Sequence, residues 1–298
     1  MKPFRRSRLL LALLVPVACE RAKAPVPADT IAAKVPVTTD SVAPRPQNWD
    51  PNAGPVLLIA AETPARAFVL LPDSANASRQ LASLPQPASI TLFSRSGTVQ
   101  SGELAAVTDT GPCVVGTLSA APPPRPWVVG FIGGVVSPLA MDSTESISHA
   151  DSAALVVGAT RLASAMPNDS AGRFSGLAFV VKGLWRFTIP GGPQVVIATL
   201  VRQINQEATP LQERTFLVAE RSARDTALTT AYTERSYGDE ETVEAREILA
   251  ALLLGSAKNA AIVVSRDYGN STAYALIGRG TDGKWRARWT SARRHCGA

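Results

Sequence analysis

Few residues in this sequence have the types and spacing that catalysis or metal binding requires. The chain has two histidines, His149 and His295, and three cysteines. No spacing among them supplies the three or four clustered ligands of a zinc site. A Ser–His–Asp triad that uses His149 stays open, because triad members need not be close in sequence, but no Gly-x-Ser-x-Gly segment is present. We therefore predict no metal and no other cofactor.

Carboxylates are concentrated in "DEETVEAREIL" (Asp239–Leu249), and paired carboxylates can hydrolyse glycosidic bonds. Arg246 lies among them, and acidic residues crowd the start of the segment, where the dipole of a helix favours them. We expect a helix over Asp239–Leu249 and a solvated helical face rather than a catalytic pair. The carboxylates of that face are Glu240, Glu241, Glu244 and Glu247.

The glycine-rich stretch "GFIGG" (Gly130–Gly134) is a weak candidate for a phosphate-binding loop. It lacks the further glycine of a dinucleotide-binding loop, and no Gly-Lys-Ser/Thr follows as in a P-loop. We expect the end of a strand with a bend.

The N-terminal segment has the pattern of a secretory signal. A basic stretch precedes an apolar run over residues 9–18, which is too short for a transmembrane helix of roughly 20 residues. Pro16 would also break a buried helix at this place. We expect residues 1–18 to be removed. Four cations leave with them, so the net charge falls from +6 to +2, which gives no reason to expect a nucleic-acid partner.

The residues "VPVAC" (Val15–Cys19) resemble the lipobox of bacterial lipoproteins, and the resemblance implies that Cys19 carries lipid. Pro16 departs from the family pattern, which usually has Leu or another aliphatic residue there. The alternative is ordinary signal cleavage after Ala24, although Pro25 would then follow the cut.

If Cys19 is lipidated, Cys113 and Cys296 remain, and two cysteines can form one disulfide in an oxidising compartment. The alternative is that both are buried free thiols. In the chain-entropy model, a bridge that closes almost the whole domain contributes about 4–5 kcal/mol.

Residues 19–52 read as a tether. The stretch 20–47 is rich in Pro, Ala and Thr and has no aromatic residue, so it cannot bury enough apolar area to fold. Its prolines favour an extended spacer. Residues 53–298 then form a globular domain, for which a sub-boundary near residue 170 is considered.

Short apolar runs dominate this domain, separated by Gly, Pro, Asp and Asn. Many are β-branched or aromatic and about four to eight residues long, which favours strands. "TLFSRSGTV" (Thr91–Val99) reads as a hairpin. The expected strands are Val56–Ala61, Ala67–Leu71, Ser89–Arg95, Cys113–Leu118, Trp127–Ile132, Leu177–Lys182, Trp185–Ile189, Gln194–Gln203, Thr215–Arg221, Thr229–Arg235, Ala260–Arg266, Thr272–Gly278 and Trp285–Ser291.

Two further segments are expected to be helical. Ser148–Ala165 has apolar residues on one face at helical spacing. Ser148 with Asp151 makes a capping arrangement, and Pro167 ends the helix. A short helix is also expected over Ala75–Leu84. The fold class is therefore mainly β (α+β), with antiparallel sheets and two or three flanking helices.

The C-terminal half contains a repeat-like pattern. "FLVAER" (Phe216–Arg221) and "TAYTER" (Thr230–Arg235) match "IVVSRD" (Ile262–Asp267) and "TAYALIGR" (Thr272–Arg279), at a period of about 45 residues. The alternative is a chance match between similar strands. The unit faintly resembles the FG-GAP repeats of extracellular propellers, which carry an Asp-rich calcium loop. The turns "GSAKNA" and "GTDGKW" lack the spaced aspartates, so we expect neither calcium nor a whole propeller.

The C-terminal "KWRARWTSARRH" mixes aromatic residues and cations, as single-strand nucleic-acid binders do. In a regular strand the two kinds of side chain would point to opposite faces. We expect a core face of Trp285, Ala287 and Trp289 and an exposed cationic patch of Lys284, Arg286 and Arg288. Because an exported protein rarely meets nucleic acid, a weaker alternative for this patch is anionic lipid head groups or lipopolysaccharide.

Together these patterns predict an exported bacterial cell-envelope lipoprotein that meets the membrane through its N-terminal lipid. The expected role is a non-catalytic binding or scaffolding module for an envelope protein or glycan. The alternative is an envelope hydrolase whose Ser and carboxylate side chains are brought together only by the fold.

Overall fold

The computed structural model describes residues 56–295, except 62, 64, 71–83, 85, 112, 120–125, 133–134, 168–171, 206–209, 223–224 and 226. The described chain is mainly β, with antiparallel sheets and one helix, which confirms the predicted fold class. The expected signal and tether, and almost all of the helix expected over Ala75–Leu84, lie outside the described residues. No helix in the described part is long and apolar enough to cross a membrane.

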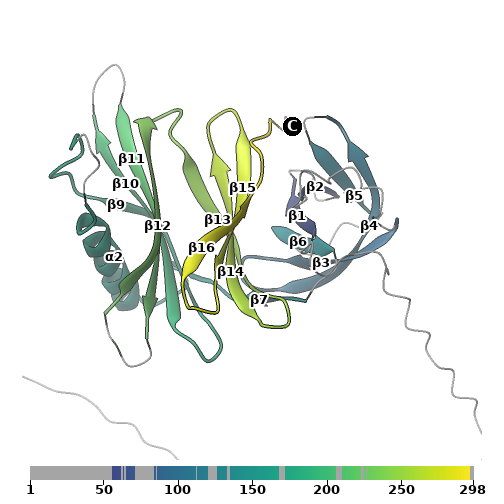
Figure 1. Ribbon diagram of the computed structural model, residues 1–298, viewed down its shortest axis with the longest axis horizontal. Helices are drawn as coiled ribbons and strands as arrows, with labels where there is room; N and C mark the ends of the chain where they lie inside the picture. Colours follow the sequence, from purple (N-terminus) through teal and green to yellow (C-terminus); the bar gives the residue numbers. More distant parts are fainter. Residues whose placement is uncertain are drawn as a thin grey trace, which may run out of the picture. The chain divides into compact units, whose positions relative to one another are not determined.

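Six strands form a closed barrel in the order β1-β2-β5-β4-β3-β6 (Figure 1). Because side chains alternate along a strand, Leu58 fills the interior, whereas Leu57 and Ile59 face outward. The hairpin predicted from "TLFSRSGTV" is confirmed, since Phe93 pairs with Val99 across the turn between β3 and β4. The strands are β1 (Val56–Ala60), β2 (Arg66–Leu70), β3 (Ala88–Phe93), β4 (Val99–Asp109), β5 (Val114–Leu118) and β6 (Val129–Ile132).

The described part of "GFIGG" belongs to the barrel wall. Gly130 lies in β6, and a Cβ atom there would come within 2.7 Å of Leu92 Cδ2 and 3.2 Å of the Thr91 carbonyl oxygen. A side chain would therefore clash with the barrel interior, so the glycine serves packing. Residues 133–134 lie outside the described part of the chain.

Two five-stranded antiparallel sheets follow the barrel in the chain. The helix-side sheet has the order β12-β11-β10-β9-β8, and its strands are β8 (Asp142–Ser143), β9 (Val180–Thr188), β10 (Gln194–Ile204), β11 (Leu211–Arg221) and β12 (Thr229–Asp239). The barrel-side sheet has the order β16-β15-β14-β13-β7, and its strands are β7 (Val136–Leu139), β13 (Ala245–Leu254), β14 (Asn259–Asp267), β15 (Thr272–Arg279) and β16 (Trp285–Thr290).

The two sheets pack face to face as a sandwich around one apolar cluster, to which each sheet contributes residues such as Ile197 and Phe216 on one side and Ile262 and Ile277 on the other. Both outer faces are covered as well. The helix-side sheet packs against α2, and the barrel-side sheet shares a cluster with the outer wall of the barrel. Two buried faces explain why strands such as β10 and β13 are almost continuously apolar.

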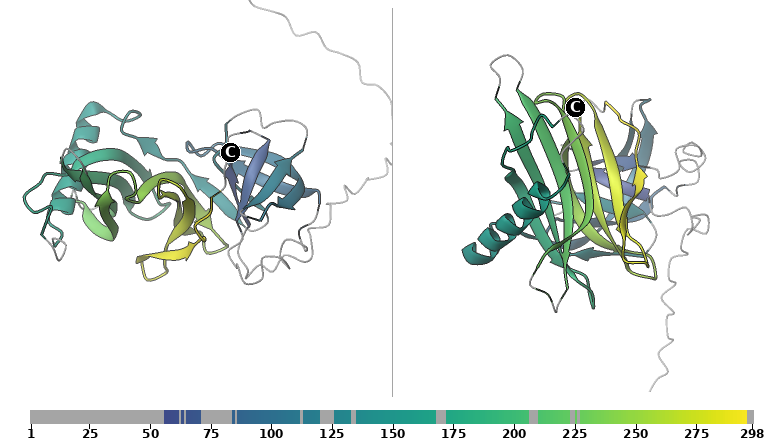
Figure 2. Two further views of the ribbon diagram at one scale, coloured as in Figure 1. Left: turned by 90° about the horizontal axis from the view of Figure 1, so that it is seen from above. Right: turned by 60° about the vertical axis from the view of Figure 1, so that its left-hand side comes forward.

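The predicted helix over Ser148–Ala165 is confirmed as α2 (His149–Ser164). The Ser148 hydroxyl accepts a hydrogen bond from the Asp151 backbone N–H at 3.1 Å, which is the expected cap. α2 lies against the outer face of the helix-side sheet beside β9 and β10, as Figures 1 and 2 show.

The helix predicted over Asp239–Leu249 is wrong. β12 continues to Asp239, a tight turn follows, and β13 begins at Ala245. The turn is closed by a hydrogen bond from the Val243 N–H to the Asp239 carbonyl at 2.8 Å. The acidic start favoured a helix locally, but pairing of the following apolar run with β14 and β7 outweighs that preference.

The repeat-like stretches lie on equivalent consecutive strands, because β10-β11-β12 and β13-β14-β15 are both antiparallel meanders. They form two facing sheets instead of propeller blades. The change from barrel to sandwich falls between Ile132 and Val136, well before residue 170. The two strands expected over Leu177–Lys182 and Trp185–Ile189 are one strand, β9, with an irregularity near Lys182.

The expected alternation in the last strand is also wrong. The register of β16 against β15 shifts so that Arg288 is an extra residue between Ala287 and Trp289. Trp285 consequently packs in the sandwich core, whereas Trp289 packs against the cluster shared with the barrel.

Candidate functional site

At one end of the sandwich the inward-facing positions change from apolar to polar. Phe216, Ile248 and Val264 belong to the sandwich core, and Tyr232 packs against it. In each of these strands, the side chains two and four residues from the core residue, toward this end of the sandwich, face the same way. These polar positions are Gln212 and Arg214 in β11, Glu234 and Ser236 in β12, Glu244 and Arg246 at the start of β13, and Arg266 in β14.

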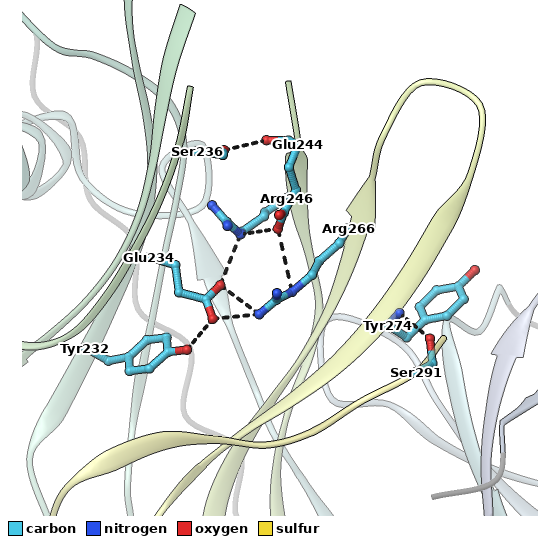
Figure 3. Close-up of polar contacts among 8 residues, drawn as sticks. All are labelled: Tyr232, Glu234, Ser236, Glu244, Arg246, Arg266, Tyr274 and Ser291. Carbon is cyan, nitrogen blue, oxygen red and sulfur yellow. Dashed lines mark hydrogen bonds and ion pairs between the residues drawn. The ribbon is translucent and has the colours of Figure 1, made fainter. Parts of the chain in front are cut away.

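Two carboxylates and two guanidinium groups form a compact cluster there, with members from both sheets (Figure 3). Arg266 Nη2 donates to both oxygens of Glu234, at 2.6 and 2.8 Å. Arg246 Nε lies 3.2 Å from Glu234 and 2.7 Å from Glu244, and Arg266 Nε lies 3.7 Å from Glu244. The Arg246 side chain is 5% exposed and Glu234 19%, so the cluster is a largely buried, charge-balanced network.

Tyr232 extends this network toward the apolar core. Its hydroxyl donates a hydrogen bond to the Glu234 carboxylate. Burial, followed by this hydrogen bond to Glu234, raises the pKa of Tyr232 well above its ordinary value of 10.0. The phenol therefore stays protonated and remains a donor at neutral pH. Ser236 adds a cross-link by donating to the Glu244 carbonyl oxygen at 3.1 Å.

A pocket of about 350 Å³ lies beside the cluster and shares Glu244 and Arg246 with it. A volume of this size is in the range of small-molecule sites. Three cationic and two anionic residues line it, which leaves one net positive charge. The lining residues come from β9, β10, β11 and the turn into β13: Lys182, Thr199, Leu200, Val201, Gln203, Gln212, Arg214, Thr215, Phe216, Glu240, Glu244, Ala245 and Arg246.

Neutral neighbours hold the Arg214 side chain in place at the pocket. Its Nε donates to Gln212 Oε1 at 3.0 Å, and its Nη2 donates to the Glu240 carbonyl oxygen at 3.4 Å. Gln212 in turn donates to Gln203 Oε1 at 3.3 Å. No ion pair joins Arg214 or Lys182 to another residue that the structure describes. The guanidinium group is therefore held in position, and no described carboxylate neutralises its positive charge.

The opposite end of the sandwich is also polar but is closed by its own contacts. Arg279 Nε and the Trp285 indole N–H both donate to Glu220 Oε1, each at 2.7 Å. This arrangement joins β11 to β15 and β16 across the two sheets and satisfies the carboxylate internally. The pocket end therefore differs in having cations that no described carboxylate neutralises.

The two histidines lie at separate, exposed positions of the described chain. His149 is the exposed first residue of α2, and the His295 ring contacts the Asn270 carbonyl oxygen. No group of three or more His, Cys, Asp or Glu that could hold a metal ion occurs within the described ranges. A triad based on His149 gains no support from this placement.

The four glutamates expected on one solvated helical face are separated in the structure. Glu240 and Glu244 line the pocket, and Glu244 belongs to the buried cluster. Glu247 points away and forms an exposed ion pair with Arg95 at the barrel. Glu241 is exposed in the turn. Because the sequence predicts a helix in this segment, it also predicts solvated side chains for Glu244 and Arg246.

The predicted cationic patch is exposed but partly neutralised. Arg286 binds Asp282 through two hydrogen bonds, at 3.0 and 2.6 Å, and the bond from Arg286 lowers the pKa of Asp282. The stem of Arg288 lies over Gly278, where a Cβ atom would meet Arg288 Cγ at 2.9 Å. Lys284 is exposed in the same region.

Cys113 is buried at the entrance to β5 and is 3% exposed. Cys296 and Cys19 lie outside the described residues, so the Cys113–Cys296 bridge and the lipidation of Cys19 stay predictions.

Sequence reasoning missed Glu234, Arg266, Arg214 and Lys182. A signal for Glu234 was present, because "TAYTERS" alternates Tyr232, Glu234 and Ser236 on the face that must be buried. A carboxylate in register with a core residue predicts a buried partner. The partner's identity, however, depends on how the two sheets stack, which one strand cannot show.

Comparison with known proteins adds no assignment to this geometry. No family model matches the chain, and no curated protein and no solved structure matches it at a significant level. The candidate site therefore rests on its own chemistry: a small, net positive pocket beside a buried ion-pair network.

Proposed function

We propose that this protein is an exported cell-envelope lipoprotein whose domain binds a small polar ligand without transforming it. One observation carries the proposal: at one end of the sandwich, the pocket holds the Arg214 guanidinium in place through neutral oxygen atoms, with Lys182 as a second cation that no described carboxylate binds. An uncompensated charge in a fixed position is costly unless solvent or a ligand satisfies it. Such preorganisation is typical of binding sites.

The state of the carboxylates supports binding over the alternative hydrolase. Glu244 is engaged by Arg246 and Arg266, and Glu234 by both arginines and Tyr232. A general acid or base needs a carboxylate that can gain and lose a proton during turnover. Each of these two carboxylates already binds two guanidinium groups, so neither is left free to exchange a proton with a substrate.

The attachment to the membrane is part of the same proposal. A lipid on Cys19 and the tether over residues 19–52 would hold the domain at the envelope. A Cys113–Cys296 disulfide would link the C-terminus of the domain covalently to the barrel. An envelope protein or glycan would then meet the pocket from outside the cytoplasm.

Mass spectrometry of membrane-extracted protein, with and without reduction, tests the attachment. We expect a diacyl or triacyl mass on Cys19 and no alkylatable thiol before reduction. An unlipidated chain that starts at Pro25, with two alkylatable cysteines, would contradict this part of the proposal.

Binding is tested by thermal-shift measurements on the full-length protein with neutral, cationic and anionic sugars and amino-acid derivatives. We expect at least one class to raise the melting temperature, and Arg214→Met to reduce the shift. Release of a hydrolysis product from any panel compound would favour the hydrolase instead. If no compound binds, the proposed function fails.

A further inference from the structure

We propose that the pocket selects a small monocarboxylate that also carries hydroxyl or amide groups, such as an acidic sugar or an N-acylated amino acid. This inference rests on the proposed binding function and names the chemical class of its ligand. The pocket cations favour an anion, Glu240 limits the negative charge that the pocket accepts, and the neutral groups indicate the rest of the ligand.

Two of the three cations that line the pocket are available to a ligand. Arg246 is occupied by Glu234 and Glu244, at 3.2 and 2.7 Å, so it contributes little free positive charge. Arg214 and Lys182 have no carboxylate partner among the described residues. These two cations therefore set the preference for an anion.

The geometry of Arg214 favours a planar anion. Its Nε and Nη2 atoms donate to neutral oxygens of Gln212 and Glu240, which fixes the plane of the guanidinium group. Lys182 reaches the same pocket from β9, where the register shift opposite Thr199 and Leu200 leaves it as an extra residue. A fixed guanidinium and a flexible ammonium on one pocket suit a carboxylate that binds both.

The net charge argues for a monoanion over a phosphate. The lining carries one net positive charge because Glu240 and Glu244 offset two of its three cations. A phosphate monoester carries about −1.5 to −2 at neutral pH, which would leave an excess of negative charge beside Glu240. A carboxylate, with a single negative charge, balances the pocket.

Neutral groups of the lining indicate what the rest of the ligand contains. Thr199, Gln203 and Gln212 supply a hydroxyl and two amides, beside an apolar part of the lining to which Leu200, Val201, Phe216 and Ala245 contribute. Amide and hydroxyl side chains both donate and accept hydrogen bonds, so they match hydroxyl or amide groups of a ligand better than an alkyl chain. A fatty acid is therefore disfavoured.

Isothermal titration of the full-length protein tests the class directly. The probes are D-glucuronate, N-acetylalanine, glucose, glucose 6-phosphate and butyrate. We expect glucuronate or N-acetylalanine to bind at least about 10-fold more tightly than the other three, the size of one lost charged contact. The ratio between the first two tells an acidic sugar from an N-acylated amino acid.

Variants connect the selectivity to the named residues. Lys182→Met and Arg214→Met should each weaken carboxylate binding by about 10-fold, whereas Lys284→Met, an exposed lysine outside the pocket, should not change it. Glu240→Gln should tighten binding, because it removes a negative charge next to the ligand carboxylate. Melting temperatures check that each variant is folded, and the exposed Lys182 keeps the test valid if Arg214→Met unfolds.

The outcomes separate the two proposals. If glucose binds as tightly as glucuronate, or if Glu240→Gln weakens binding, the pocket binds a ligand but the monocarboxylate class is wrong. If the phosphate is preferred, the charge argument is wrong. If none of the probes and none of the wider panel binds, both proposals fail together.

Discussion

The barrel and the sandwich are both antiparallel, yet they fill their interiors differently. The barrel interior is an apolar cluster that includes Leu58, Leu92 and Leu104. The sandwich has an apolar centre, but charged groups cross between its sheets at both ends. A closed barrel is held in register by backbone hydrogen bonds all the way round. Two open sheets touch only through side chains, so directional ion pairs are one way to fix how they stack.

The cross-sheet pairs follow the repeat-like order of the strands. Glu220 in β11 binds Arg279 in β15, and Arg266 in β14 binds Glu234 in β12. In the two three-strand units, β11 corresponds to β14 and β12 corresponds to β15. The two ion pairs therefore join equivalent strands, but the acid of one pair stands where the base stands in the other. Two similar three-strand units that face each other thus acquire complementary charges, which disfavours pairing of a unit with its own kind.

The largest loss of stability is expected from Glu234→Gln, which removes a carboxylate that joins the two sheets of the sandwich. The change leaves Arg246 and Arg266 with Glu244 as their remaining cluster carboxylate, and we expect a loss of about 4 kcal/mol in the free energy of unfolding. Urea denaturation measures it. The matched control is Glu247→Gln in the same part of the chain, whose side chain is 56% exposed and whose ion pair should matter by less than about 1 kcal/mol. Equal effects would show that the cluster is not holding the sheets together.

In the barrel, Leu104→Ala should destabilise through loss of packing alone. Leu104 is fully buried, and we expect about 3 kcal/mol, from lost apolar burial and the cavity that remains. Added salt should leave this loss unchanged, and ligand binding to the folded variant should match the wild type. A change in binding affinity would mean that barrel and pocket are coupled, against the distinction drawn between them.

A smaller effect, about 2 kcal/mol at neutral pH, is expected from Tyr232→Phe, which removes a hydrogen bond to a charged group. Burial and then Glu234 raise the pKa of Tyr232 in the folded state above its ordinary value of 10.0. The stabilisation is therefore fully present below pH 10 and is lost as the pH rises toward the folded-state pKa. Denaturation at increasing pH should show the gap between wild type and variant narrowing above pH 10. A gap that widens there would contradict the protonated, donating phenol.

The sequence was sufficient for what depends on local pattern. The short apolar runs, many of them β-branched or aromatic, predicted most strands, and Ser148 and Asp151 predicted the start of α2. The segment from Asp239 to Leu249 failed, because its acidic start and helix-forming residues are a local signal, whereas β13 is made by its neighbours β14 and β7. The same error hid the candidate site, because Glu244 and Arg246 face inward only when this segment is a strand.

The remaining site residues depend on contacts that no single segment encodes. Arg214 and Lys182 come from different strands, and only the register of β9 on β10 and of β10 on β11 puts both at one pocket. The barrel was not predicted either, because closure of β1 onto β6 is a long-range pairing.

The extra residue in β16 has a consequence for changes in chain length. Arg288 shifts the phase of the inside–outside alternation, which lets one short edge strand place Trp285 in one core and Trp289 in another. Deleting Arg288 would restore a regular period and rotate every following side chain by half a turn. A single-residue deletion there would therefore detach the C-terminal segment from the barrel, whereas a substitution of the same arginine would leave the attachment intact.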